Sequence, residues 1–528
     1  MNKPWVHPPL ASKNFNKFTN KPKNIFSNCY FLSQKDGFNG TIRIKEPGTY
    51  VLTENIEFHF NSNNNFKPTE KQTLGPDADY PLAPNGAYNL GFFAGIAIEC
   101  DNVTLDLNGY KLSQSQEFSL NQRFFALIEL ASSPFIPKQG PSNFGSSILV
   151  PNNVTIKNGI LGKNSHHGIH GNLMKNITLS NLTFKDFEVA AIALNGGENI
   201  LIKDCLILNN SKNINVLSTF SQGLFALPHL ELIVKRDPSL FLRVDSKKIT
   251  GPMLLNSLKE EIRLAKNYVL KNEPYNGIFK NKSKLYDGNV YGIVLNSKGV
   301  VIGDFKNILN NETVGNKNIT LENISVNNLS TDSTEIIGVN CDSNTSSDNI
   351  KAYGKDQFVG PVGDVLDIEL VTNDNGTYKE NVYSNVQFFI SKNGKTKKEL
   401  GTSNISEELI AWVEKNKNIN DYLRENKNDD NSTKCNYKIK GRDSMGHVMK
   451  GNMGIFISQG ENININNSVI SNLTNNGKRG KAADSCGILV CGSKNIKIEN
   501  NKCLNIKSKN GQSENIGKRT NNENILIK

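Results

Sequence analysis

One six-residue pattern recurs along the chain and limits its fold more than any other feature. The pattern is asparagine, an apolar residue, any residue, an apolar residue, any residue, and then asparagine or aspartate. Full copies begin at Asn153, Asn176, Asn199, Asn318, Asn462 and Asn495. Variant or partial copies begin at Asn102, Gly299 and Asn524. Because apolar residues alternate with others along each copy, the pattern predicts a short β-strand.

The last residue of each copy is suited to bend the backbone. Asparagine and aspartate accept left-handed φ angles more readily than most residues that carry a Cβ atom. We therefore expect bends at Asn158, Asn181 and Asp204, each leading from one strand into the next. If the copies stack, these side chains should form a ladder in which each amide bonds the one above.

The spacing of the copies allows them to stack. Asn153, Asn176 and Asn199 follow one another at a constant interval, which we call the coil interval. A second apolar strand precedes most copies, and its examples begin at Gly95, Gly168, Ala191, Gly292, Gly454 and Gly487. A third strand follows the bend, as in Leu182–Phe184. Three strands per repeat predict a three-sided solenoid in which each coil buries its apolar row against its neighbours.

Other repeat folds fit these strands less well. A leucine-rich repeat would need its own consensus and helices, and an antiparallel sandwich would show closely spaced hairpin turns instead of the constant coil interval. The Gly-Ile strands, the asparagine repeat and residues 103–109 (Val-Thr-Leu-Asp-Leu-Asn-Gly) resemble the pectin-lyase-like superfamily of right-handed parallel β-helices. The resemblance covers 95–210, 290–350 and 450–528. It implies an all-β, right-handed, three-sided parallel β-helix, and it says little about function.

Two segments interrupt the repeat, and together with an N-terminal cap they divide the chain into six parts. Pro252 to Lys271 has an apolar face of helical spacing. Leu366–Leu370 alternates like a strand, the turn signal at 374–376 follows it, and Ser406 is placed to cap a further helix. We expect an N-terminal cap (1–90), β-helix coils (91–210), a helical insertion (211–285), coils (286–352), an α+β insertion (353–450) and C-terminal coils (451–528).

Charge and cysteine content narrow the range of partners. The net charge is +11 and the pI about 9.0, but the lysines are scattered, so nucleic acid is an unlikely partner. None of the eight cysteines forms a CxxC pair, which argues against a zinc ribbon. Several cysteines occupy expected core positions, as free thiols do in a reducing compartment.

The chain shows no signal peptide and no membrane span. Residues 1–24 lack an apolar h-region, and no stretch approaches the roughly 18 apolar residues of a spanning helix. About one residue in seven is asparagine, and Lys and Ile are frequent, as in proteins from A/T-rich genomes such as those of protists or large DNA viruses. We therefore expect a cytoplasmic or virion-associated protein instead of a classically secreted one.

The resemblance makes a polysaccharide-degrading enzyme a possibility that residues must support. Asp429-Asp430 lies in a polar insertion, Arg479-Gly480-Lys481 matches an Arg-x-Lys motif in letters only, and 167–171 is one residue from a Gly-His-Gly motif. Paired carboxylates for glycoside hydrolysis and an acidic calcium cluster for lyase chemistry do not stand out on adjacent strands.

The best candidate for a ligand or metal site comes from stacking positions that are one coil interval apart. This places Asp186 above Lys163 and Glu188 above Ser165, beside His166, His167 and His170. Such a patch could hold a metal ion or perform acid–base chemistry. The alternative is that His170 is a satisfied side chain on its strand and that the others are solvated turn residues.

Two functions follow from these observations. The first is a non-enzymatic β-helix protein with a structural or carbohydrate-binding role, associated with a surface or a virion. The second is a polysaccharide lyase or glycoside hydrolase that acts on acidic polysaccharide through a divergent active site. The sequence stops inside a repeat at Ile527-Lys528, so the last coil could pair with a partner or a second copy, or be a frayed strand covered by an insertion.

Overall fold

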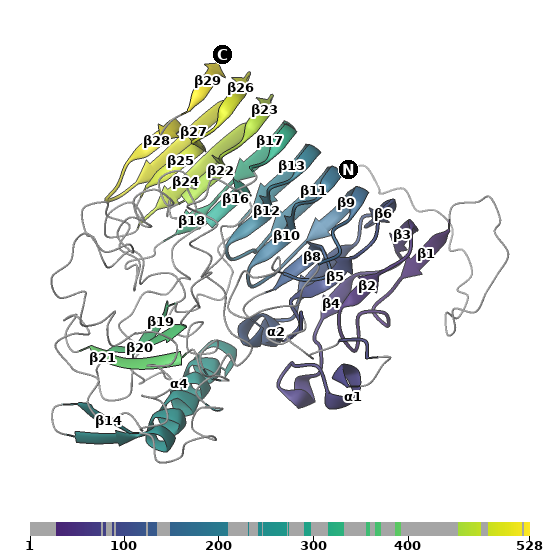
Figure 1. The fold of residues 1–528 in the computed structure, drawn as a ribbon. Coiled ribbons are helices and arrows are strands. Elements are labelled where there is room, and N and C mark those ends of the chain that lie inside the picture. The colour runs from purple at the N-terminus through teal and green to yellow at the C-terminus, as the bar shows by residue number, and fades with distance from the viewer. Residues whose placement is uncertain are drawn as a thin grey trace.

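The fold was obtained as a computed structural model (Figure 1). The structure describes residues 28–74, 78–80, 87–88, 91–122, 125–134, 148–209, 227, 231, 241–244, 247–271, 273, 290–296, 315–331, 355–359, 365–370, 386–391, 452–476, 484–519 and 522–528. Within this part of the chain, strands are far more abundant than helices, and most strands belong to two large sheets.

Sheet A has 15 strands, and its pairings are all parallel. Its main row is, in order, β1 (Cys29–Leu32), β3 (Gly48–Leu52), β6 (Val103–Asp106), β9 (Asn152–Leu161), β11 (Lys175–Lys185), β13 (Glu198–Leu208), β17 (Lys317–Asn327), β23 (Glu461–Asn466), β26 (Lys494–Glu499) and β29 (Glu523–Ile527). Beside this row lie β4 (Ile56–Phe58), β7 (Lys111–Gln114), β18 (Ser330–Thr331), β24 (Val469–Asn475) and β27 (Lys502–Ser508).

Sheet B has nine parallel strands that alternate with those of sheet A along the chain. They are β2 (Ile42–Ile44), β5 (Ala94–Ile98), β8 (Ala126–Leu130), β10 (His167–Asn172), β12 (Ala190–Asn195), β16 (Val290–Asn296), β22 (Asn452–Ser458), β25 (Ser485–Cys491) and β28 (Ser513–Arg519). Long parallel sheets stacked coil on coil are consistent with a solenoid of the β-helix type, as the repeat predicts.

The register between strands confirms the predicted stacking of the repeats. Ile177 pairs with Val154 on the coil before it and with Ile200 on the coil after it, each one coil interval away. All three side chains are buried in a single apolar core that lies between the two sheets. Each coil therefore covers the apolar row of the next, and the core grows by addition of coils instead of by closure around one centre.

The expected bends occur inside the long strands of sheet A. Asn158, Asn181 and Asp204 have φ angles of 60°, 52° and 54°, which confirms the left-handed conformation predicted for them. On the coil after β17, the bend lies between two separate strands. The part of β17 before its own bend pairs with β23, and the part after it pairs with β24.

Asparagine side chains form ladders along the coils, as predicted. The Nδ2 of Asn181 donates to the Oδ1 of Asn158 at 3.0 Å, and Asn323 donates to Asp204 at 2.7 Å. The first asparagine of each copy, which we did not expect to be left-handed, forms a longer ladder of the same kind. Its Nδ2–Oδ1 hydrogen bonds, 3.0 to 3.1 Å long, run through Asn176, Asn199, Asn318, Asn462, Asn495 and Asn524.

The N-terminal part combines strands with short helices and a cluster of aromatic rings. Strands β1 to β4 already pair within sheets A and B, so the sheets begin inside the segment that we expected to be a cap. A 3₁₀ turn, Ser62–Asn64, and the helices α1 (Glu70–Thr73) and α2 (Gln116–Asn121) lie between the strands. The rings of Phe60, Phe92 and Phe118 pack with centroids 4.8 and 5.0 Å apart, which fills the core at this end.

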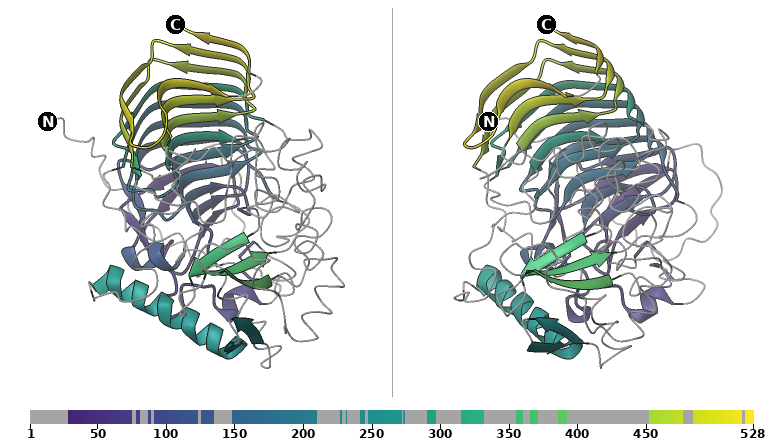
Figure 2. Two further views of the ribbon diagram at one scale, coloured as in Figure 1. Left: turned by 90° about the vertical axis from the view of Figure 1, so that its left-hand side faces the viewer. Right: turned by 60° about the vertical axis from the view of Figure 1, so that its left-hand side comes forward.

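Helix α4 (Gly251–Lys271) lies where the sequence predicts a helix. It follows an antiparallel pair, β14 (Phe241–Val244) and β15 (Lys247–Thr250), and it contacts α2. A second antiparallel sheet contains β19 (Lys355–Val359), β20 (Val365–Leu370) and β21 (Val386–Ser391), which agrees with the predicted hairpin. Both views in Figure 2 place α4 and the β19–β21 sheet at the end of the molecule opposite β29. The turn at 374–376 and the helix expected after Ser406 lie outside the described residues.

No helix in the described ranges is both long enough and apolar enough to cross a membrane.

Candidate functional site

The predicted histidines lie on the outer face of sheet B, which is the side of that sheet opposite the common core. Side chains on this face form columns, because successive strands are in register. In one column His170 lies between Glu129 of β8 and Ala193 of β12. His167 lies in the adjacent column, between Ala126 and Ala190. His167 thus has alanines on both neighbouring strands, whereas His170 has an alanine on one side and Glu129 on the other.

A buried carboxylate–imidazole pair is at the centre of this site. The Nδ1 atom of His170 lies 2.7 and 2.8 Å from the two carboxylate oxygens of Glu129, and only 1% of Glu129 is exposed. Burial raises the pKa of Glu129 above its ordinary value, while the nearby His170 opposes that rise. The carboxylate is accommodated here because an imidazole N–H is aimed at it from the next coil.

The other ring nitrogen of His170 is also engaged. The Nδ2 of Asn195 lies 3.2 Å from Nε2 of His170 and donates a second hydrogen bond, of 2.9 Å, to the Oδ1 of Asn172. This network assigns the proton of neutral His170 to Nδ1, with Nε2 as acceptor. With both nitrogens satisfied, His170 connects three consecutive strands, β8, β10 and β12.

The three histidine rings are stacked against one another. The centroids of His166 and His167 are 4.0 Å apart, and those of His167 and His170 are 5.1 Å apart with nearly parallel planes. Burial and the two neighbouring imidazoles lower the pKa of His167 well below its ordinary value of 6.5. The site therefore holds His167 neutral near pH 7.

The two acidic residues of the predicted patch lie on the next coil. A β-bridge between Asn164 and Phe187 confirms that the coil interval also holds in this segment. Asp186 has a left-handed φ of 55°, and its carbonyl oxygen accepts a hydrogen bond from the Asn164 N–H at 3.3 Å. Among the described residues no hydrogen bond or ion pair joins Asp186 to the histidines. Glu188 follows on the same segment, one residue before Val189, whose N–H donates to the carbonyl of His166.

Sequence reasoning brought the three histidines together but missed the groups that bind His170. Glu129 is the single charged residue in the apolar run from Ala126 to Leu130, which was a usable signal, because a carboxylate at such a position requires a partner. Asn172 and Asn195 are one coil interval apart, so the repeat could have placed them together as well.

The described residues do not contain a group of three or more His, Cys, Asp or Glu side chains arranged to hold a metal ion. Metal binding by the histidine patch therefore stays a prediction. What the geometry does provide is a buried carboxylate–imidazole pair beside a neutral imidazole.

Farther along the solenoid the same outer face of sheet B becomes apolar. In the column of His170, the later coils carry Val294, Phe456 and Leu489, of which 4% or less is exposed. Together with neighbours on adjacent columns they form a second hydrophobic cluster, separate from the common core: Val189, Ala190, Ala193, Tyr291, Val294, Met453, Phe456, Cys486, Leu489 and Cys491.

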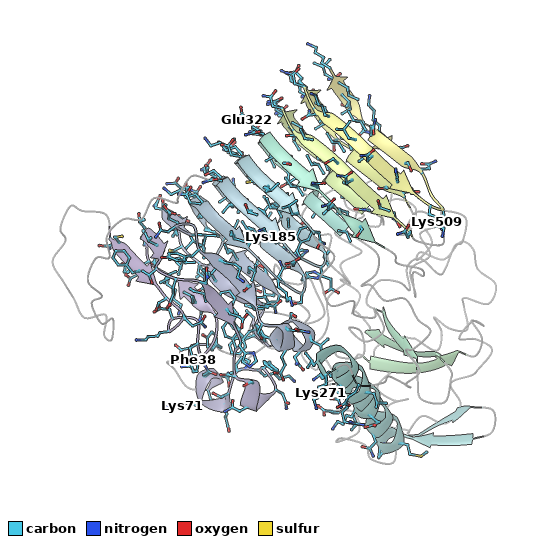
Figure 3. All side chains as sticks on the ribbon, turned by 180° about the vertical axis from the view of Figure 1, so that it is seen from behind. Phe38, Lys71, Lys185, Lys271, Glu322 and Lys509 are labelled. Atoms are coloured by element: carbon cyan, nitrogen blue, oxygen red, sulfur yellow. The ribbon has the colours of Figure 1, made fainter. Side chains whose placement is uncertain are left out.

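The outer face of sheet A differs in exposure and in chemistry. One column carries lysine and glutamate in strict alternation from coil to coil: Lys175, Glu198, Lys317, Glu461, Lys494 and Glu523. Its ion pairs join Lys175 to Glu198 at 2.9 Å and Lys317 to Glu461 at 3.4 Å. The first asparagine ladder runs directly beside this column, and Figure 3 shows the side chains that project from this part of the molecule.

Comparison with known families and with curated proteins finds no match for this chain.

The arrangement of residues is therefore the ground on which a function can be argued. It contains two distinct regions: a buried imidazole–carboxylate network on sheet B, and an exposed, regular array of amides and paired charges on sheet A.

Proposed function

We propose that this protein is a non-enzymatic scaffold with a structural or carbohydrate-binding role at a surface, built as a right-handed, three-sided β-helix of the pectin-lyase-like type. The bends at Asn158, Asn181 and Asp204 support the third side, because each divides a strand of sheet A into two segments. The handedness follows from the resemblance in sequence and from the strong preference of parallel crossover connections for the right-handed form.

The outer face of sheet A is the observation that carries the proposed binding role. Amide and charged side chains recur there at the spacing of adjacent strands, about 4.8 Å. They offer donors and acceptors to the hydroxyl groups of a long polymer. Because lysine and glutamate alternate, their charges cancel along the column, which favours a neutral glycan over an anionic one.

Binding to insoluble and arrayed neutral polysaccharides tests this proposal. The informative variant combines Asn464→Ala and Lys497→Ala, which removes two polar side chains from the outer face of sheet A. Lys71→Ala, on the short helix α1, is the matched control. Loss of glycan binding in the first variant and its retention in the control would support the proposal. Equal binding by the wild type, the double variant and the control would show that glycan binds elsewhere than on the outer face of sheet A.

A second candidate is a polysaccharide lyase or glycoside hydrolase, and the observation in its favour is the histidine site. A neutral His167 beside a buried His170–Glu129 pair has the protonation state that a general base needs. Assays for new reducing ends and for the absorbance of 4,5-unsaturated products test it on acidic polysaccharides. Activity that disappears in His167→Gln would replace the scaffold proposal with this one.

A further inference from the structure

The alternating lysine–glutamate column on sheet A is complementary to its own reverse. Ion pairs between adjacent coils of one chain do not require this property. It holds three lysines and three glutamates on six successive strands, β11, β13, β17, β23, β26 and β29. The side chains are accessible: 60% of Lys175, 50% of Lys317 and 54% of Lys494 is exposed, and their glutamate partners are 38% to 68% exposed. Reversal of the order of the coils converts every lysine position into a glutamate position.

We propose that two copies of this chain associate through the outer faces of sheet A, about a two-fold axis that runs parallel to the strands between β17 and β23. This operation places Lys317 of one copy opposite Glu461 of the other, Glu198 opposite Lys494, and Lys175 opposite Glu523. Each contact occurs twice, as a two-fold interface requires.

The other columns of this face are compatible with the same operation. In the column four residues beyond the asparagine ladder, Lys203 faces Glu499 of the second copy. The remaining positions juxtapose a charged with a neutral side chain, or two neutral ones: Ser180 with Lys528, Glu322 with Asn466, Thr178 with Leu526, Leu201 with Lys497 and Thr320 with Asn464. No like charges are opposed, and like-charge contacts are what most strongly suppress wrong partners.

A second copy fits this face better than an anionic or cationic partner does. A polyanion would meet a glutamate on every second coil, and a polycation would meet a lysine. The alternation also pairs neighbouring coils within one chain, but exposed ion pairs of that kind contribute little to the stability of a fold. Stabilisation of one chain and contact between two copies can be tested separately, because the ion pairs within one chain depend only on adjacent coils.

The size of the face predicts weak association. Six strands at about 4.8 Å, each with about 20 Å of contact length, give roughly 600 Å² per copy, or about 1,200 Å² in total. This is near the lower limit for specific interfaces, so the dimer should form at high protein concentration and low salt. The interface covers the same face of sheet A for which glycan binding is proposed, so a bound glycan and a second copy would compete, and self-association is measured without glycan.

A variant with the whole column inverted tests the proposal. It carries Lys175→Glu, Glu198→Lys, Lys317→Glu, Glu461→Lys, Lys494→Glu and Glu523→Lys. Adjacent coils keep opposite charges, so the fold should be retained, which circular dichroism and thermal unfolding verify. Sedimentation equilibrium at low salt should then show equal self-association of the wild type and of the inverted variant.

Mixing the two proteins gives the decisive result. In a mixed dimer every opposed pair of the column carries like charges, so the Kd for mixed pairs, measured by energy transfer between labelled chains, should be at least about ten-fold higher than for either homodimer. Mixed and homogeneous pairs of equal affinity would overturn the proposal. So would a wild type that remains monomeric at low salt, whatever the outcome of the glycan experiments.

Discussion

The outer faces of the two sheets are built from the same repeat but have opposite environments. On sheet A the outward side chains are polar and accessible, and asparagine ladders and alternating charges connect the coils. On sheet B most outward side chains from β8 to β25 are buried, polar around His170 and apolar around Phe456. A strand repeat therefore determines which residues face the common core, whereas the environment of the opposite face depends on individual outward residues.

The largest expected difference in stability is between a leucine-to-alanine substitution on the outer face of sheet B and the same substitution on the outer face of sheet A. Leu489→Ala on sheet B, where 1% of the side chain is exposed, should lower the free energy of unfolding by about 3 kcal/mol, because it leaves a cavity. Leu201→Ala on the half-buried outer face of sheet A should cost about 1 kcal/mol or less. Urea unfolding measures both. Equal losses would mean that the two faces do not differ in burial.

A smaller difference is expected between a buried and an exposed glutamate. Glu129→Ala removes the acceptor of His170 Nδ1 and should cost about 2 kcal/mol, since a buried donor loses its partner. Glu198→Ala removes only an accessible partner of Lys175 and should change stability by about 0.5 kcal/mol or less. If Glu129→Ala were as mild as Glu198→Ala, the imidazole–carboxylate pair would not stabilise sheet B.

The contrast between the faces also shows what could be predicted from the sequence. Apolar alternation around Ile177, Leu179 and Ile202 identified strands, register and core, because these depend on spacing alone. The coil interval likewise brought Asp186 and the histidines onto neighbouring coils. Whether a residue on an outer face is buried does not recur at a fixed interval along the sequence. The coil between Glu129 and His170 is longer than the coil interval, so the contact between these two residues was not anticipated.

The asparagine ladder on sheet A can be separated from the backbone conformation that accompanies it. Asn199 has a left-handed φ of 56° and bonds Asn176 and Asn318. Asn199→Ala loses the ladder and strains the backbone, and should cost about 1.5 kcal/mol; Asn199→Gly loses only the ladder and should cost less, about 0.5–1 kcal/mol. Denaturant unfolding of both variants compares the two contributions. Equal costs would indicate that left-handed geometry does not select asparagine here.

The smallest effect, about 1 kcal/mol, should appear as a dependence of stability on pH to which His167 of the sheet B site contributes. The pKa of His167 is depressed in the folded protein, so the unfolded chain takes up a proton below about pH 6.5 while the folded chain does not. Stability from this group is therefore complete above pH 6.5 and decreases as the pH falls toward the folded pKa. The raised pKa of Glu129 acts in the opposite sense, since its contribution is present below its ordinary value of 4.5 and is lost as the pH rises.

Unfolding of the wild type and of His167→Gln between about pH 7.5 and pH 5.5 distinguishes these contributions. Across this range the wild type should lose stability, and the variant should lose less, because the contribution of the depressed His167 pKa is removed. His59→Gln, which removes a histidine that contacts Ser115 away from the cluster, is the matched control. If His167→Gln retained the full decrease instead, protons would be taken up elsewhere. The stacked imidazoles would then have to be more accessible to water than the other buried residues on the outer face of sheet B.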